Sequence, residues 1–390
     1  MKPALLSLGL GCLLATGCDT TEAKSPDDET SSSESEPVLP GLTLLGNQGF
    51  YSVSIEEMAT ADDGLNMPRD LAFDPEVDGL LWVVNMRDDS VVHLFNAGTT
   101  EQSIDKVIDP YAVHFMDNVS SIDFGQPGTF GTCQESRNTY NGTAPPNYFM
   151  GPSLWPSDLD LFGTSNPEAV EYLSNLYGYP VDLGSHLDML HESPLCMGIA
   201  WEYDNVYWVV DGYHGAVVRY DFVEDHGIGY DDPSDGIIDM HIEGELAYES
   251  GVPAHLEIAP GTRWLYVADP LNARVLRLDM DSGTKGSRLP VNEPGTTYHA
   301  WDDTTWEVFL DGAVAGFDMV SGLEFVGDTL IVSDNTSGEI IAFDPDGTEV
   351  DRISTGLGPG AIMGMAVRSD TELWFTDAVE DKVYRLTPDR

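Results

Sequence analysis

The chain has 390 residues and a formal net charge of −50, because only 17 basic side chains stand against 67 acidic ones. Nucleic-acid binding needs a basic face that displaces counterions from phosphates, so this composition excludes a nucleic-acid partner and disfavours docking on anionic lipid. Hydrophobic residues make up 42% of the chain, which is ample for a sizeable core.

The N-terminus has the features of an export signal. Met1 and Lys2 precede an apolar run, Ala4–Ala15, that is too short to span a bilayer as a helix. The run ends in Leu14-Ala15-Thr16-Gly17-Cys18, which resembles a bacterial lipoprotein signal. This resemblance implies that residues 1–17 are a signal peptide and that Cys18 is lipidated. The alternative is an ordinary cleaved signal and release of the protein.

Residues 18–41 contain few apolar side chains and many Ser, Asp and Glu. Such a segment cannot bury enough surface to offset its conformational entropy, so we expect a disordered acidic tether. No later stretch is long and apolar enough to cross a membrane, so the lipid would be the only membrane anchor. The expected location is the bacterial cell envelope, on the periplasmic or surface side.

A five-residue phrase organises the rest of the chain. In each copy an apolar strand ends in Asp or Asn, and the next apolar strand begins six residues later. A constant step between varied sequences indicates two strands joined by a fixed turn, repeated along one chain. The copies are Leu81–Asn85, Tyr207–Asp211, Leu265–Asp269, Leu330–Asp334 and Leu373–Asp377.

A shorter apolar strand precedes each phrase and a fourth strand follows it, and a degenerate sixth unit begins at Val119. The sequence therefore predicts an all-β fold over residues 42–390, a six-bladed β-propeller of four-stranded antiparallel blades. The lone strand Phe50–Ile55 should pair beside Val383–Leu386 as the outer strand of the last blade. A partly helical insertion at about 160–195, with a helix at Pro167–Tyr177, should lie over the mouth of the channel.

The phrase resembles NHL repeats most closely at Val267-Ala268-Asp269-Pro270-Leu271-Asn272-Ala273-Arg274-Val275, although the other copies lack the Asn-Arg pair. NHL-type propellers include zinc-dependent peptidylglycine amidating lyases and protein- and RNA-binding modules, and the related gluconolactonase-like propellers use an axial calcium ion. Met67-Pro68-Arg69-Asp70 is similar to an amidating-lyase motif in which arginine replaces the metal-binding histidine. The resemblance specifies the fold better than the function.

Aligning the inner strands places Asp70 and His255 on one axial ring, with Arg69 one layer above. Asp70, His255 and Arg69 are the candidate catalytic residues. His255, His191, His214 and Asp70 are the candidate ligands of a divalent metal that would polarise a carbonyl or activate a water. The alternative is that these histidines cap turns and bond backbone groups.

A second candidate metal site is an acidic loop, in which Asp231, Asp232, Asp235 and Asp239 partly resemble a bacterial Asp-rich calcium loop. Hard carboxylate oxygens at alternate positions suit Ca²⁺. The alternative is a solvated acidic loop.

Cys133 and Cys196 are the cysteines left after export, and adjacent blades should bring them to the same mouth. We expect a disulfide between them, with two buried thiols as the alternative.

The predicted function is therefore an exported, lipid-anchored binding module that presents its axial mouth to a protein, glycan or small-molecule ligand. The alternative is a metal-dependent lyase or lactone hydrolase with an axial His/Asp site that uses Ca²⁺ or Zn²⁺. No nucleophile elbow, phosphate-binding loop or dinucleotide fingerprint is present in the sequence.

Overall fold

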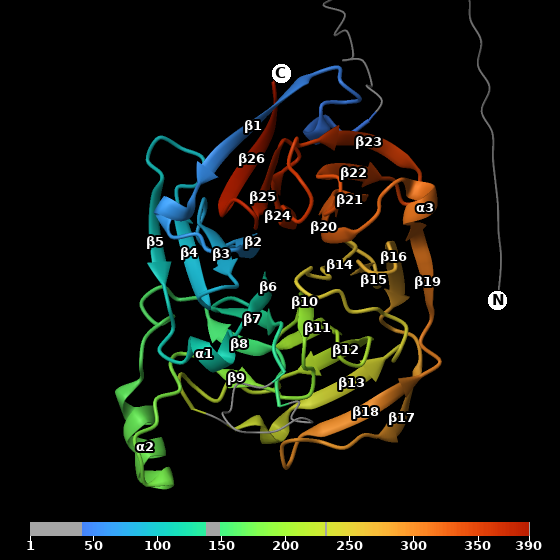
Figure 1. The fold of residues 1–390 in the computed structure, drawn as a ribbon. Coiled ribbons are helices and arrows are strands. Elements are labelled where there is room, and N and C mark those ends of the chain that lie inside the picture. Colours follow the sequence, from blue (N-terminus) through green and yellow to red (C-terminus); the bar gives the residue numbers. More distant parts are fainter. Residues whose placement is uncertain (1–40, 138–148, 231, 390) are drawn as a thin grey trace, which may run out of the picture. The chain divides into compact units, whose positions relative to one another are not determined.

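The computed structural model describes residues 41–137, 149–230 and 232–389. The expected signal peptide, Cys18 and nearly all of the expected tether lie outside these residues. The described chain folds into six sheets set radially around one axis (Figure 1). The predicted all-β, six-bladed propeller is therefore confirmed.

Each of the six blades contains four antiparallel strands, which are given below from the innermost to the outermost. Blade 1 contains β2 (Pro68–Phe73), β3 (Leu81–Asn85), β4 (Ser90–Phe95) and β5 (Ser103–Val107). Blade 2 contains β6 (Val119–Phe124), β7 (Thr129–Gln134), β8 (Ser153–Pro156) and β9 (Asp188–Met189). Blade 3 contains β10 (Cys196–Tyr203), β11 (Val206–Asp211), β12 (Ala216–Asp221) and β13 (Ile237–His241).

The second half of the ring follows the same plan. Blade 4 contains β14 (Leu256–Ile258), β15 (Trp264–Asp269), β16 (Arg274–Asp279) and β19 (Trp306–Asp311). Blade 5 contains β20 (Val320–Val326), β21 (Thr329–Asp334), β22 (Glu339–Phe343) and β23 (Glu349–Ser354). Blade 6 contains β24 (Ile362–Ser369), β25 (Glu372–Asp377), β26 (Lys382–Asp389) and β1 (Ser52–Ala59). Inner strands of successive blades are in contact, and β24 contacts β2 to close the ring.

The last blade is completed by the N-terminal strand β1, which pairs antiparallel with β26 and sets Ile55 opposite Leu386. This is the predicted closure. It joins the two ends of the described chain and covers the edge of β26, which would otherwise expose unpaired backbone groups.

The terminal Asp of the repeated phrase explains the constant turn. In blade 3, Oδ1 of Asp211 accepts hydrogen bonds from the backbone N–H groups of Tyr213 and His214, each at 2.9 Å. In blade 6, Asp377 does the same for Val379 and Glu380, each at 3.0 Å. A short carboxylate that reaches its own following backbone fixes one turn geometry, so the step to the next strand is constant.

The core lies between neighbouring blades. The indole of Trp82 on β3 is fully buried and packs against Phe124 and Phe130 of blade 2, with ring centroids 5.6 and 5.0 Å away. Trp208 and Trp374 occupy the same position on β11 and β25 and are also fully buried. Large aromatic side chains at this position fill the widening gap between adjacent sheets.

Blade 3 departs from the predicted plan, because β17 (Thr284–Arg288) and β18 (Thr297–Asp302) extend its sheet to six strands. This hairpin leaves the chain between β16 and β19 of blade 4, and β18 pairs parallel with β13. The sequence does not predict this hairpin, since the segment Thr284–Arg288 is polar and lacks the alternation of a half-buried strand.

Helices are short in the described residues: α1 (Ala112–Phe115), α2 (Pro167–Tyr177), α3 (Gly312–Ala315), and the 3₁₀ turns Thr43–Leu45, Ala61–Asp63 and Pro233–Asp235. The predicted helix is present as α2, capped by the Asn166 side chain, which accepts from Glu168 N–H at 3.1 Å. None of these helices has the length and hydrophobicity needed to span a membrane.

The placement of the helical insertion differs from the prediction. Helix α2 lies at the outer rim of the ring and not over the axial mouth (Figure 1). Nδ2 of Asn166 donates to the carbonyl of Ile228 at 2.8 Å, which ties the start of the helix to the loop between β12 and β13. The loop is peripheral because it joins outer strands, so the helix docked on it is peripheral too.

Cys133 at the end of β7 and Cys196 at the start of β10 form a disulfide, with their Cα atoms 5.0 Å apart. The predicted bridge is therefore confirmed. It ties blade 2 to blade 3 at the base of the long insertion.

Candidate functional site

Asp70 and His255 meet across the propeller axis. They come from the inner strand of blade 1 and the start of the inner strand of blade 4, which face each other in a six-bladed ring. The Oδ2 atom of Asp70 lies 3.5 Å from Nδ1 of His255. The side chains are only 6% and 8% exposed, so the axis is closed at this level.

Burial determines the protonation of this pair. It raises the pKa of Asp70 well above its usual value, although the backbone N–H groups of Ile122 and Leu71 each donate to the carboxylate at 2.9 Å. Burial, assisted by the charge of Arg69, lowers the pKa of His255 to about 3. Both groups therefore favour their neutral forms. A neutral imidazole can ligate a metal ion, but a protonated carboxyl group cannot, so burial works against Asp70 as a metal ligand.

Arg69 closes the end of the channel where the inner strands begin. Its side chain is fully buried, and Nη1 lies 3.0 Å from Oε2 of Glu135. The other oxygen of Glu135 accepts from the hydroxyl of Tyr248 at 2.5 Å and from the backbone N–H of Gly251 at 2.8 Å. The guanidinium is thus held by a network that joins blades 1 and 2 to the segment before β14.

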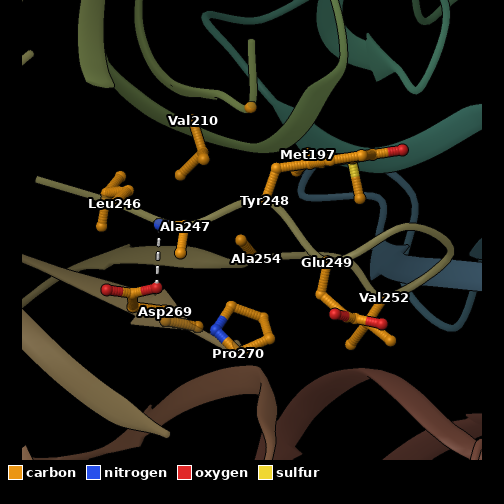
Figure 2. Close-up of a pocket in the computed structure, with 12 residues that line it drawn as sticks. Met197, Val210, Leu246, Ala247, Tyr248, Glu249, Val252, Ala254, Asp269 and Pro270 are labelled. Carbon is orange, nitrogen blue, oxygen red and sulfur yellow. Dashed lines mark hydrogen bonds between the residues drawn. The ribbon is translucent and has the colours of Figure 1, made fainter. Parts of the chain in front are cut away.

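That segment also fills the space between blades 3 and 4 at the same end. Figure 2 shows Leu246, Ala247 and Tyr248 lying between Val210 and Met197 on one side and Asp269 on the other. The backbone N–H of Ala247 donates to Asp269 Oδ1 at 3.2 Å. The cavity left there measures about 10 Å³, which is room for about one water molecule.

His191 and His214, the other two predicted metal ligands, contact different partners. His191 places Nε2 3.2 Å from Nε2 of His114 and Nδ1 2.7 Å from Oε1 of Glu293. His214 places Nδ1 2.7 Å from Oδ2 of Asp211. The structure thus brings His255 to Asp70 but joins neither of the other two histidines to that pair.

The described aspartates of the predicted calcium loop each contact a different partner. Asp231 lies outside the described residues. Asp232 accepts from Ser234 N–H at 3.3 Å, and Asp239 lies 3.8 Å from Nζ of Lys285. Asp235 instead pairs with His226, whose Nε2 is 3.0 Å from its Oδ1.

One group in the described part of the chain has the spacing of a metal site. Asp188, His226 and Asp235 each offer a ligand atom, and these atoms lie within 4.8 Å of one another. Asp188 belongs to β9, and the other two belong to the loop between β12 and β13. The group is at the rim between blades 2 and 3, away from the axis.

A larger cavity opens on the axis at the opposite end, where the inner strands finish. Its volume is about 340 Å³, and inner strands of all six blades line it. Three carboxylates face it, from blades 2, 4 and 5. The lining residues are Ala72, Phe73, Pro75, Asp123, Phe124, Gly125, Trp201, Glu257, Glu324, Ala366 and Val367.

The three carboxylates share one level of the propeller. Strand register aligns Asp123, Glu257 and Glu324 two residues beyond the ring that contains Asp70 and His255. Side chains alternate along a strand, so residues two apart point to the same side. The inner-strand alignment made from the sequence covered only the ring of Asp70 and His255 and the layer of Arg69. Applying the same alignment two residues further along would have revealed these carboxylates.

The cavity holds its carboxylates in an unfavourable environment. Burial raises the pKa of Asp123 to about 7, against a hydrogen bond that it accepts from Trp201 N–H at 2.6 Å. Burial also raises the pKa of Glu257 well above its usual value, and the charges of Glu324, Asp123 and Asp70 add to this. Burial, together with the charges of Asp70 and Asp123, also raises the pKa of Glu324 well above its usual value. A bound positive charge would relieve this mutual repulsion.

The spacing of the axial carboxylates decides which cation fits. In the described residues, only the group at the rim brings three ligand atoms within 4.8 Å, so the axial carboxylates are too far apart to coordinate one bare metal ion together. Aromatic rings complete the wall, from Phe73, Phe124 and Trp201. Carboxylates and aromatic faces around an open space suit an organic cation.

Comparison with known proteins supports the architecture. No protein-family profile and no curated protein matches the sequence. The structure is similar to an auxiliary nutrient binding protein from Bacteroides ovatus, with 13% identity, a TM-score of 0.52, and coverage of 87% of this chain and 78% of that one. An auxiliary nutrient binding protein from Bacteroides thetaiotaomicron has 11% identity, a TM-score of 0.52 and coverage of 87% and 77%.

A luciferin-regenerating enzyme is also similar in structure, with 14% identity, a TM-score of 0.50, and coverage of 86% of this chain and 95% of that one. At these identities the likeness concerns the fold alone. The chain is a six-bladed β-propeller whose axis is closed at one end and opens at the other into an acidic cavity.

Proposed function

We propose that the protein is an exported binding module whose axial cavity binds a small organic cation, an ammonium or quaternary ammonium compound. The observation that carries this proposal is the convergence of Asp123, Glu257 and Glu324 on one cavity of about 340 Å³. Three partly buried carboxylates repel one another, and a cation in their midst removes that cost.

The shape and lining of the cavity support an organic ligand over an inorganic one. Trp201 is among the residues that line the cavity, and its backbone N–H donates to the carboxylate of Asp123. An aromatic face attracts the methyl or methylene groups around an ammonium nitrogen, and this attraction adds about 0.5–2 kcal/mol to binding. The carboxylates would set the charge of the ligand, and the aromatic rings would favour an alkylated nitrogen.

Two further considerations support the role of a module outside the cytoplasm. Two of the structurally similar proteins are named auxiliary nutrient binding proteins, in keeping with ligand capture. The chain contains the disulfide Cys133–Cys196. Disulfides form and persist mainly in oxidising compartments. Together with the apolar N-terminal run ending in Cys18, this supports export and attachment by lipid to the bacterial cell envelope.

The test is a calorimetric titration with a matched pair of probes. Choline carries a quaternary ammonium group, and 3,3-dimethylbutanol has the same shape with carbon in place of nitrogen. We expect choline to bind with one site per chain and the neutral analogue to show no heat of binding. Equal binding of both probes, or binding of neither, would contradict a cation site.

A divalent metal is the second candidate ligand, at Asp188, His226 and Asp235 or, as the sequence suggested, at an axial site using Asp70 and His255. The compact spacing of the rim group favours the first location. A metal there would tie the long insertion to blade 3, whereas a metal at the axis would support lyase or lactone hydrolase chemistry. Elemental analysis of the purified protein and of its His226→Gln and His255→Gln variants distinguishes the two locations.

A further inference from the structure

A second cavity lies at the outer rim of the ring, between the loop that precedes α1 and the end of α2 (Figure 1). Its volume is about 480 Å³, which is within the range of ligand sites in proteins. Tyr111 forms one wall, and Tyr177, Tyr179 and residues 180–183 form the other. None of these residues lines the axial cavity.

One buried carboxylate holds the two walls together. Oδ1 of Asp109 accepts a hydrogen bond from the backbone N–H of Tyr111 at 2.8 Å. Its Oδ2 accepts from the backbone N–H and from the hydroxyl of Ser185, each at 2.7 Å. Because Asp109 is buried, water does not compete for these bonds. The spacing of the two walls is therefore set by the protein itself.

The end of α2 presents two tyrosine rings side by side. The helix ends at Tyr177, and Gly178 adopts the left-handed conformation, with a φ of 78°, that terminates a helix. The ring centroids of Tyr177 and Tyr179 lie 6.0 Å apart, with the planes inclined by 37°. Beyond the turn, the Ser174 hydroxyl accepts from the backbone N–H of Val181 at 2.9 Å. The two rings thus form a preset aromatic surface.

These rings are largely accessible. Tyr177 is 51% exposed and Tyr179 is 62% exposed. The Tyr111 phenol faces the same space, since burial raises its pKa and the neighbouring Tyr179 phenol adds to the effect. Large aromatic side chains gathered on an exposed surface mark a place where a partner binds. The cavity therefore presents three tyrosines to an occupant.

The one ionised side chain among the described lining residues is already engaged. Oδ2 of Asp182 accepts from the Ser165 hydroxyl at 2.6 Å, and Oδ1 accepts from the backbone N–H of Gly184 at 3.0 Å. The phenols that complete the lining are neutral at ordinary pH. A neutral occupant therefore suits this cavity, in contrast to the organic cation proposed for the axis.

The phenol hydroxyls decide between an apolar and a hydroxylated occupant. Each can donate one hydrogen bond and accept another, as the hydroxyl groups of a sugar do. The face of each ring is electronegative and attracts the C–H bonds on the apolar face of a pyranose ring. A purely apolar occupant would remove the phenol hydroxyls from water without giving them partners, at a cost in affinity.

We propose that this cavity is a second ligand site, which binds a neutral sugar chain. A pyranose ring stacks on Tyr177 and Tyr179, and its hydroxyl groups exchange hydrogen bonds with these phenols and with that of Tyr111. The proposal does not depend on the axial site.

The test is native electrophoresis in gels that contain amylopectin, laminarin, galactomannan or xyloglucan, which are soluble neutral polysaccharides. A neutral polymer cannot retard an acidic protein through charge, so slower migration relative to bovine serum albumin reports binding. We expect at least one polymer to retard the natural protein. Tyr177→Ala/Tyr179→Ala should weaken that binding about tenfold or more, with an unchanged thermal midpoint because both residues are exposed. Retardation by none of the polymers would overturn the proposal.

Tyr172→Ala is the matched control, because Tyr172 lies on the same helix, is 57% exposed and does not line the cavity. It should leave polysaccharide binding intact, as should Glu257→Gln in the axial cavity, so failure at one site is distinguishable from failure at the other. Binding that the Tyr177→Ala/Tyr179→Ala variant retains in full, or that Tyr172→Ala loses equally, would overturn the proposal.

Tyr177→Phe/Tyr179→Phe separates a sugar from an apolar partner. This variant keeps both rings and removes two hydroxyl groups, so it should weaken polysaccharide binding about twofold to tenfold. Unchanged or tighter binding would show that the hydroxyls make no bonds to the occupant and would overturn its assignment as a sugar.

Discussion

His255 and Asp70 close the propeller axis, with Nδ1 of the histidine 3.5 Å from Oδ2 of the aspartate although 185 residues of sequence separate them. The two residues belong to opposite blades, so their contact fixes the width of the ring at that level. Burial favours the neutral form of each group, so the pair closes the axis and links the inner strands of two blades. The open acidic cavity lies beyond this level.

Asp70→Asn should therefore destabilise the fold without abolishing ligand binding. The Asp70 carboxylate accepts from two backbone N–H groups, and an amide can accept only one of these bonds and sets an N–H against the other donor. We expect a loss of about 1–3 kcal/mol in the free energy of unfolding, measured by urea titration. Choline affinity should change little. If this variant instead lost both a bound metal ion and an enzymatic activity, the result would support the alternative of an axial metal site.

The axial carboxylates predict an unusual pH dependence of stability. A carboxyl group whose pKa is higher in the folded protein than in the unfolded chain binds more protons when folded, so stability falls as the pH rises through that interval. For Asp123 the interval runs from the ordinary value near 4 to about 7. Urea titrations at pH 5 and pH 8, without ligand, should show this fall.

Glu257→Gln and Glu324→Gln should flatten that dependence. Each removes one charge from the cavity, so each should raise the free energy of unfolding at pH 8 by about 1 kcal/mol and have less effect at pH 5. Glu101→Gln, on the exposed surface, is the control and should not change the difference between the two pH values. The same pH slope in all four proteins would show that the cavity carboxylates do not repel one another.

Much of the fold was predictable because the repeated phrase carries its own turn chemistry. A buried aspartate such as Asp377 caps the turn that follows it, so the six-residue step is a local property and shows in one sequence. The closure by Ile55 and Leu386 was also predictable, since a propeller needs a partner for its last strand. The β17–β18 hairpin was not, because polar strands that dock on another blade have no pattern of their own.

The candidate site was predicted only in part, for a geometric reason. Alignment of the inner strands placed Asp70 and His255 together, and they are in contact. It could not show that these side chains fill the axis, nor that the space opens two residues further on at Glu257. His191 lies in a loop whose path depends on tertiary packing, so its partner Glu293 could not be paired with it from sequence, whereas His214 contacts Asp211 within the repeated turn.

The disulfide should contribute strongly to stability. Cys133 and Cys196 are 63 residues apart in sequence, and closing a loop of that size in the unfolded chain contributes roughly 4 kcal/mol in the chain-entropy model. Cys133→Ser/Cys196→Ser should lower the urea midpoint correspondingly, and reduction of the natural protein should reproduce the effect. If the oxidised protein and the double variant unfold at the same urea concentration, the bridge does not constrain the fold.

Strand β1 should be required for a closed, monomeric ring. A chain that starts at residue 60 lacks the partner of β26 and exposes its edge, which promotes pairing with other chains. We expect this truncation to unfold at lower temperature and to self-associate in light scattering, whereas a chain that starts at residue 41 keeps the stability of the full-length chain. A stable monomer without residues up to 59 would contradict the role of β1.

The most direct test of the axial site is a calorimetric titration of choline into Glu257→Gln/Glu324→Gln, with Glu101→Gln/Glu380→Gln as a control of equal charge that alters only exposed residues. The account predicts that choline binds the control as it binds the natural protein and shows no detectable binding to the axial double variant. Undiminished binding to the axial variant, with the fold intact, would contradict the claim that the axial carboxylates form the ligand site.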